Sequence, residues 1–288
     1  PTVSASKTSQ GWTSGNINVS LDYSDQGSGI KTKQYAWSTS TSKPSSWNNY
    51  SSSLTLSSQG TRYLHYRAID NVGNETTGYF GPYRIDKNAP SVSFSPNGNS
   101  TYEKSHSTKV SVSDSVSGVK TRQYVWTKST SQPTSGWTNF SNGATLSTPT
   151  STGNHYLWVK TTDNGGNQAI VRSNVFKVDR TSPNGSLSAS TVDWTNEDVV
   201  LRISGISDAH SGFKHIVRPD GSVTTATSFN YSVRQNGTYT FTIYDKAGNT
   251  KTLKHTVTTI ERDKPTVNIE KIKQTNTKID IRLHYSDE

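Results

Sequence analysis

The residues best suited to chemistry in this 288-residue sequence are aspartates that recur in a fixed order. One kind precedes a Ser-Gly pair by three positions, a second opens an Asp-x-x-Gly-Asn motif, and a third lies shortly before a Pro. The first kind comprises Asp25, Asp114 and Asp208, the second Asp70, Asp163 and Asp245, and the third Asp86, Asp179 and Asp263. Carboxylates bind hard cations, and they also cap tight turns by accepting backbone N–H groups. Both roles therefore need to be considered.

The aspartates belong to an internal repeat that a Pro opens each time, at Pro1, Pro90, Pro183 and Pro265. The repeats are 89, 93 and 82 residues long, which is too long for ankyrin or tetratricopeptide repeats and suits a seven-stranded β-sandwich. We therefore expect three modules, at residues 1–88, 89–181 and 182–264, and the start of a truncated fourth module at 265–288.

Between these landmarks, apolar residues alternate with polar ones, as they do in strands with one buried face. Ile17, Val19, Leu21 and Tyr23 precede the first Asp, and residues 279–285 repeat the pattern. Ahead of the Asp-x-x-Gly-Asn motifs the alternate positions are expected to face solvent, and they include His65 and Trp158. The pattern predicts an all-β fold of tandem immunoglobulin-like antiparallel β-sandwiches, arranged as an elongated monomeric rod.

The two candidate metal sites are expected at the junctions between modules. In an immunoglobulin-type sandwich, the loop after the second strand and the loop between the last two strands lie at the pole where the chain enters. The expected clusters are Asp86, Asp114 and Asp163 at the first junction, and Asp179, Asp208 and Asp245 at the second. With carbonyl and amide oxygens from Asn164, Asn167 or Asn249, they would suit Ca²⁺. The alternative is that each Asp caps its own turn and that Lys87 or Arg180 neutralises part of the charge.

The tryptophans offer a second kind of candidate site. Trp37 and Trp126 lie where a core Trp is expected in such a sandwich. Trp47 and Trp137 follow loop-like sequence, so they either cap the core or line a ligand-binding patch for a glycan or a host protein. The third repeat has no counterpart of either pair.

A family resemblance rests on phrases such as "YAWSTSTSKPSSW", "YVWTKSTSQPTSGW", "YRAIDNVGNETT", "IDKNAP" and "VDRTSP". They resemble the immunoglobulin-like repeats of large bacterial surface proteins and adhesins, Gram-positive ones in particular. The resemblance covers the whole chain and implies an extracellular location at the cell surface or cell wall. Calcium-stiffened junctions are known in some of these proteins. The resemblance specifies the module and leaves its ligand open.

Composition and motifs exclude several other classes. The sequence has no Cys, no long apolar run for membrane insertion and no recognisable catalytic motif, so we expect a non-enzymatic protein. The net charge of +9 is dispersed over all three repeats rather than gathered in one stripe, which argues against nucleic acid. We expect a structural stalk or spacer segment. The alternatives are ligand-binding adhesin modules, or accessory modules of a secreted glycan-degrading enzyme or phage tail protein.

Overall fold

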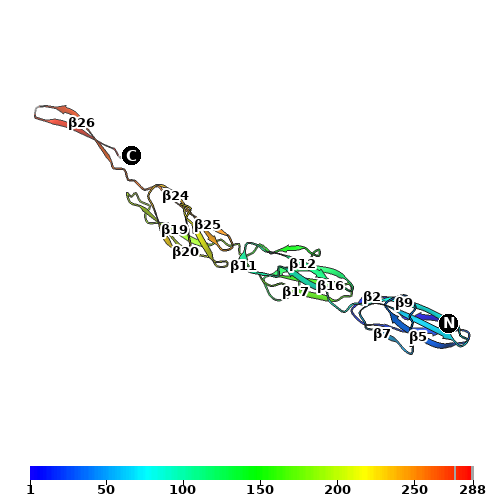
Figure 1. Ribbon diagram of the computed structural model, residues 1–288. Helices are drawn as coiled ribbons and strands as arrows, with labels where there is room; N and C mark the ends of the chain where they lie inside the picture. Colours follow the sequence, from blue (N-terminus) through cyan, green and yellow to red (C-terminus); the bar gives the residue numbers. More distant parts are fainter. Residues whose placement is uncertain (276, 287–288) are drawn as a thin grey trace. The chain divides into compact units, whose positions relative to one another are not determined.

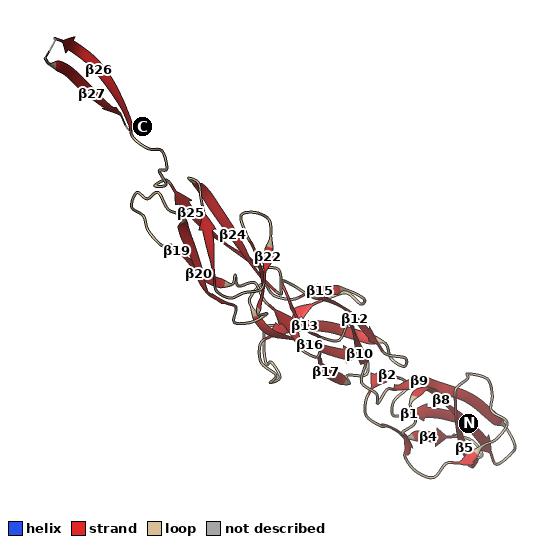
Figure 2. Cartoon of the chain, turned by 60° about the vertical axis from the view of Figure 1, so that its left-hand side comes forward, coloured by secondary structure: helices blue, strands red, loops and turns tan. Residues whose placement is uncertain are grey.

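The computed structural model describes residues 1–275 and 277–286, and every regular element within them is a β-strand (Figure 1, Figure 2). The chain divides into two compact units. Unit 1 comprises residues 1–100, 105–149 and 154–177, and unit 2 comprises residues 101–104, 150–153 and those from 178 onward. In β12 (Ser107–Ser113) every second side chain is buried, as expected of a strand with one face on a core. The predicted all-β fold class is confirmed.

The first strands of unit 1 form sheets that share one hydrophobic core. They are β1 (Thr2–Ala5), β2 (Gln10–Thr13), β3 (Ile17–Val19), β4 (Leu21–Ser24), β5 (Ile30–Ser38), β6 (Asn48–Asn49), β7 (Leu54–Leu56), β8 (Gly60–Asp70) and β9 (Glu75–Ile85). The larger sheet has the order β2-β9-β8-β5-β6, and the pairs β1-β4 and β3-β7 contribute to the same core. Leu64, Tyr83 and Ile85 are fully buried there. The ring of Trp37 packs edge-on against Tyr83, as predicted for a core Trp.

A second core follows in the same unit. Its strands are β10 (Ser91–Ser95), β12, β13 (Val119–Thr127), β14 (Thr138–Asn139), β15 (Thr145–Ser147), β16 (Gly153–Asp163) and β17 (Gln168–Arg172), and β11 (Asn99–Glu103) and β18 (Phe176–Val178) adjoin the division between the units. The order β10-β12-β15 makes one sheet, while β16 pairs with both β13 and β17. Val110, Val112, Leu157 and Val159 fill the space between them.

Unit 2 holds a third core between two more sheets. Its strands are β19 (Asn184–Ala189), β20 (Val199–Ser207), β21 (Phe213–Val217), β22 (Val223–Thr224), β23 (Phe229–Val233), β24 (Gly237–Asp245) and β25 (Thr250–Val257). The sheet orders are β19-β20-β23 and β22-β21-β24-β25. Leu201, Ile203, Ile216, Phe241 and Ile243 are all buried between these strands. Each core therefore lies between sheets that are largely antiparallel, with β2-β9 as a parallel pair in the first, and this frame fixes where the loops at its ends lie.

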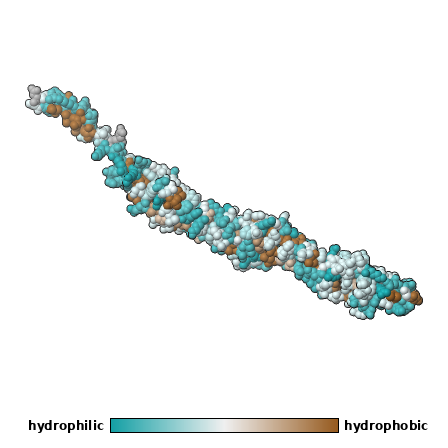
Figure 3. Space-filling view, in the orientation of Figure 1, coloured by the Kyte–Doolittle hydropathy of each residue, from teal (hydrophilic) through white to brown (hydrophobic). Residues whose placement is uncertain are grey.

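A hairpin of β26 (Thr266–Gln274) and β27 (Ile279–Ser286) ends the described chain. Val267 lies opposite Tyr285 and Ile269 opposite Leu283, in the manner of the β1-β4 pair. These side chains are exposed, and apolar surface is visible on the hairpin in Figure 3. The register supports the idea that the hairpin begins a fourth module. The module limits after residues 88, 181 and 264 stay predictions.

Candidate cation sites

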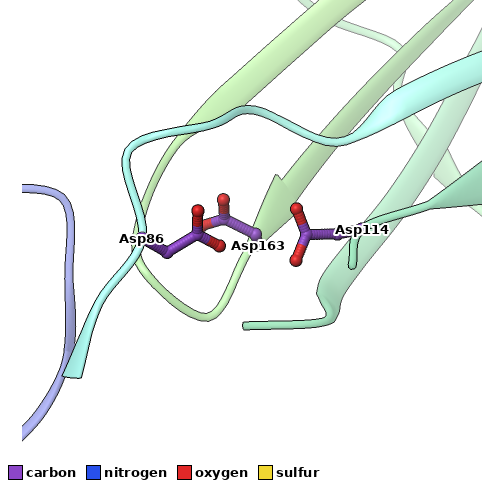
Figure 4. Close-up of side chains that lie close together, drawn as sticks. All are labelled: Asp86, Asp114 and Asp163. Carbon is purple, nitrogen blue, oxygen red and sulfur yellow. The ribbon is translucent and has the colours of Figure 1, made fainter. Parts of the chain in front are cut away.

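Three aspartates of unit 1 come together although they lie far apart in the sequence (Figure 4). Asp86 follows β9, Asp114 follows β12, and Asp163 is the last residue of β16. One carboxylate oxygen of each lies within 4.8 Å of those of the other two. Asp86 and Asp163 are fully buried, and Asp114 is half-buried. The structure thus brings together the three carboxylates that the sequence analysis assigned to one junction.

Asp163 is held by the turn that its own motif forms. Its Oδ1 accepts the backbone N–H of Asn167 at 2.8 Å, and its Oδ2 accepts the Asn167 side-chain amide at 2.8 Å. Gly166 has a φ of 93°, a left-handed conformation that Gly adopts without strain. This explains the spacing Asp-x-x-Gly-Asn, because the turn needs a carboxylate at its start, a Gly before its end and an amide to close it.

Asp114 caps the turn after β12. Its Oδ1 accepts the backbone N–H groups of Val116, Ser117 and Gly118 at 3.1, 2.9 and 2.7 Å. Among the described residues, the hydrogen bonds found for this carboxylate all reach Oδ1. Its Oδ2 therefore keeps its lone pairs for another partner, so capping the turn does not prevent the same side chain from binding a cation.

Asp86 belongs to the segment that leaves β9 and is tied to both of these turns. Its Oδ2 accepts the N–H of Ser117 at 3.1 Å, and its backbone carbonyl accepts the side-chain amide of Asn167 at 2.9 Å. Gly165 lets the segment approach, because a Cβ at that position would lie 3.1 Å from both Cβ and the carbonyl oxygen of Asp86. The carboxylate and the backbone carbonyl of Asp86 thus attach this segment to the loops of Ser117 and Asn167, which lie about 30 and 80 positions later in the sequence.

Unit 2 contains a second cluster with the same construction, made of Asp179, Asp208 and Asp245 within 4.8 Å of one another. Ser211 donates its backbone N–H to Asp179 Oδ2 at 3.0 Å. Asn249 donates its side-chain amide to Asp245 Oδ2 at 2.8 Å and to the Asp179 carbonyl at 3.0 Å. The arrangement is therefore repeated contact by contact, as expected if one local sequence pattern builds both clusters.

The pKa of the Asp179 carboxyl is lowered from its ordinary value. Burial by itself would raise the pKa, but hydrogen bonds from Thr181 and Ser211 to the carboxylate stabilise its charged form and outweigh burial. Asp179 is thus held as an anion among other carboxylates, which is the state that a metal ligand requires.

The basic residues next to the clusters are directed elsewhere. Lys87 donates its ammonium to Asn16 Oδ1 at 2.9 Å, and Arg180 donates its Nε to the carbonyl of Lys104 at 2.7 Å. Neither contact neutralises a cluster carboxylate, contrary to the alternative considered for the sequence. The three neighbouring carboxylates of each cluster repel one another, and a bound cation would relieve this repulsion.

The asparagines do not play the part expected of them. Asn167 and Asn249 turn their amide N–H₂ groups toward the carboxylates, and Asn164 donates to the carbonyls of Ser117 and Gly118. An amide nitrogen that donates in this way cannot be a cation ligand. Asn167 and Asn249 orient the carboxylates through these N–H₂ groups.

The equivalent turns of the first repeat, which contain Asp25 and Asp70, hold only part of this arrangement. Asp25 Oδ2 accepts the N–H of Gly29 at 2.9 Å, and Asp70 Oδ2 accepts the amide of Asn74 at 2.7 Å, so both turns form. Within the described residues, the groups of three or more acidic side chains or histidines with metal-ligand spacing are the two named above. Asp25 and Asp70 therefore show what the turn motifs do without a third carboxylate.

The sequence analysis named Asp263 as the acidic residue that leaves the third repeat, in the place that Asp86 and Asp179 take in the first two, and this is wrong. The backbone N–H of Asp86 bonds to Thr13 and that of Asp179 to Glu103, and Glu261, not Asp263, makes the corresponding bond to Thr195 at 2.9 Å. Asp263 instead donates its own N–H to Glu261 Oε1 at 2.7 Å, as Asn88 does to Asp86 at 3.1 Å. Glu261 therefore occupies the exit position.

The two candidate ligand-binding tryptophans have different surroundings. Trp47 is half-buried and lines a small hollow on the outer face of the β5-β8-β9 sheet. Trp137 is half-buried too, but the ammonium of Lys160 lies 4.7 Å from its ring centroid.

Comparisons with known proteins find resemblance at the level of the fold. No family model and no curated protein matches the sequence. A structure from a 1.5-MDa bacterial ice-binding adhesin is 11% identical, with 86% of this chain and 91% of that chain covered and a TM-score of 0.35. Extracellular domains 3–5 of Drosophila OTK are 11% identical, with 86% of this chain and 92% of that chain covered and a TM-score of 0.31. Fibronectin(III)-like modules of Clostridium thermocellum CbhA are 13% identical, with 62% of this chain and 93% of that chain covered and a TM-score of 0.29. These likenesses carry no information on ligand or activity.

Among the residues that the structure describes, no helix has the length and apolar character that a bilayer crossing needs.

Proposed function

We propose that the chain is a non-enzymatic structural segment of an extracellular bacterial surface protein, built of tandem immunoglobulin-like modules that act as a spacer. In this proposal each carboxylate cluster binds one Ca²⁺, which fixes the segment between consecutive modules. The observation that carries it is the repetition of one construction, in which Asp86 or Asp179 is bonded to two turns of the sheets that follow. A spacer needs the connections between its modules held in one geometry. The two clusters contain four buried carboxylates, those of Asp86, Asp163, Asp179 and Asp245.

The donor set of each cluster favours Ca²⁺ over Mg²⁺. Calcium takes six to eight oxygen ligands at about 2.3–2.6 Å, so two ligands of one ion can lie up to about 5.2 Å apart. The carboxylate oxygens of each cluster lie within 4.8 Å of one another, inside that limit. Magnesium demands near-ideal octahedral geometry and usually keeps several of its waters, so it is seldom bound by several protein carboxylates together. Three carboxylates supply the hard, anionic ligands, and carbonyl or water oxygens would complete the shell.

Calorimetry and a matched pair of substitutions test the proposal. Titration of the chain with CaCl₂ should show two binding events, and EDTA should lower the melting temperature. Asp114→Asn should remove one event, because this carboxylate belongs to a cluster. Asp25→Asn changes the equivalent turn outside any cluster and should leave both events in place. Absence of heat with CaCl₂, together with an unchanged melting temperature in EDTA, would show that the carboxylates act only through their hydrogen bonds.

A further inference from the structure

The outer face of the β2-β9-β8-β5-β6 sheet carries a hollow of about 70 Å³. His65 of β8 and Tyr79 of β9 lie opposite each other in the sheet and line it, together with Trp47 from the segment between β5 and β6. This segment lies over the sheet, because His65 Nε2 bonds to the carbonyl of Ser40 at 2.8 Å. His65 is consequently buried rather than facing solvent as the alternation predicts. Sheet and covering segment together make a concave surface.

The second core carries the equivalent pair of strands with different side chains at these positions. Trp158 lies opposite Arg172 there, as His65 lies opposite Tyr79. The Arg172 guanidinium lies 5.7 Å from the Trp158 ring centroid and 5.2 Å from that of Tyr156. Trp158 is also buried, against expectation. An indole and a guanidinium therefore stand where the first core has an imidazole and a phenol.

The hollow presents an aromatic surface in a fixed orientation. Tyr79 is 48% exposed, and its ring is held edge-on by Tyr63 with the centroids 5.7 Å apart. Trp47 is half-buried on the other side of the hollow. A pyranose ring offers a face of C–H bonds that packs against such aromatic faces, because the π-system is negative and the C–H groups are weakly positive.

Polar groups surround the aromatic ones. Thr41, Thr77 and Lys43 also line the hollow and can exchange hydrogen bonds with sugar hydroxyls. The ammonium of Lys43 is paired with Glu75 Oε1 at 2.8 Å, and the same carboxylate also pairs with Arg67 through Oε2 at 2.8 Å. Because the Lys43 ammonium is already held by a carboxylate, the threonine hydroxyls are the groups left for a ligand, and they suit the hydroxyls of a neutral sugar.

We propose that this hollow is a binding site for one neutral hexose unit of a glycan. Sites for drug-sized ligands measure about 300–1,000 Å³, so a hollow of about 70 Å³ takes one ring substituent while the ring rests on Tyr79. Binding of one sugar over so small an area is weak, with a dissociation constant of about 1 mM or higher. Several weak sites on neighbouring copies of a surface protein would bind a glycan coat through avidity. The site is separate from the carboxylate clusters and does not depend on Ca²⁺.

Nuclear magnetic resonance of the tryptophan indole N–H groups tests this proposal directly. The chain is titrated, in EDTA, with D-glucose, D-galactose and N-acetyl-D-glucosamine, and the Trp47 signal is assigned with Trp47→Phe. We expect at least one sugar to shift the Trp47 signal saturably and to leave the Trp137 signal unmoved. If none of the three sugars shifts the Trp47 signal, or if all indole signals drift together without saturation, the proposal is wrong.

Two variants and a control localise the effect. Tyr79→Ala removes the exposed ring, and the double substitution His65→Trp with Tyr79→Arg copies the arrangement of the second core. Each should weaken sugar binding at least about tenfold, a difference of about 1.4 kcal/mol, whereas Trp137→Phe should leave binding unchanged. Melting temperatures close to that of the unaltered chain show that the variants are folded. Undiminished binding by the folded Tyr79→Ala variant would overturn the assignment.

Discussion

The carboxylate of Asp86 accepts the backbone N–H of Ser117, 31 positions further along the chain, at 3.1 Å. The same bond joins Asp179 to Ser211 at 3.0 Å. In each case a fully buried carboxylate on an exit segment is satisfied by a turn of the sheets that follow. The position of the exit segment is therefore fixed by a charge-assisted hydrogen bond, whose strength exceeds that of a neutral one.

Substitution of this buried carboxylate should separate its two roles. Asp86→Ala leaves the Ser117 N–H without its acceptor in the buried cluster. We expect the free energy of unfolding of unit 1 to fall by about 1–3 kcal/mol. Asp86→Asn keeps an oxygen for that N–H, so it should lose less stability but still abolish Ca²⁺ binding at the first cluster. Scanning calorimetry with and without Ca²⁺ measures both. Equal Ca²⁺ stabilisation of Asp86→Asn and the unaltered chain would contradict the proposed role.

The close approach at Gly165 gives a second prediction. A Cβ there would lie 3.1 Å from the Asp86 carbonyl oxygen, and the corresponding position of unit 2 is Ala247. Gly165→Ala should be tolerated with a small shift, whereas Gly165→Val adds methyl groups that push the exit segment away and should cost about 1–3 kcal/mol. It should also weaken Ca²⁺ binding at the first cluster only. Ala247→Gly is the matched control, and calorimetric titration should find both of its sites unchanged.

Sequence reasoning found the clusters because their parts are set by local chemistry. A turn with a left-handed Gly and a closing amide requires the residues of Asp163, Gly166 and Asn167 in that spacing, and sandwich topology then brings the turns to one end. It failed at the third exit acid because it looked for the nearest Asp. Glu261 lies four residues before Pro265, as Asp86 does before Pro90 and Asp179 before Pro183, and its N–H makes the corresponding bond to Thr195.

Sequence reasoning also failed where a loop covers the outer face of a sheet. The period-two pattern correctly separates the core-facing Leu64 from His65, but it assigns the second face to solvent. His65 is buried because the segment containing Ser40 lies over it. Periodicity within one strand cannot contain this information, since the covering residues come from another part of the chain.

The pH dependence of unit 1 should reflect Asp70, which lies outside the clusters. Burial would raise the pKa of this carboxyl, but hydrogen bonds from the side chain and backbone of Asn74 outweigh burial and lower it below the ordinary 3.8. The unfolded chain has a pKa of about 3.9, so the folded form binds protons less readily. The stabilisation is complete above that value and is lost as the pH falls through the lower folded pKa. Carboxyl NMR titration should show the low pKa, and Asn74→Ala should raise it. An unshifted pKa in the Asn74→Ala variant would contradict this account.

Limited proteolysis should report whether Ca²⁺ holds the exit segments in place. Lys87 and Arg180 are exposed residues that directly follow Asp86 and Asp179, so trypsin can cleave there once the segment detaches from its turns. Cleavage follows the population of the open form, and a ligand that binds only the closed form lowers this population in proportion to its saturation. With Ca²⁺ at about 100 times its dissociation constant, cleavage at both positions should slow by about 100-fold. Arg262 follows Glu261, which is in neither cluster, and its cleavage should be the same with Ca²⁺ and with EDTA. Equal slowing at all three positions would indicate an effect of Ca²⁺ on trypsin itself, and no slowing at Lys87 and Arg180 would contradict the calcium sites.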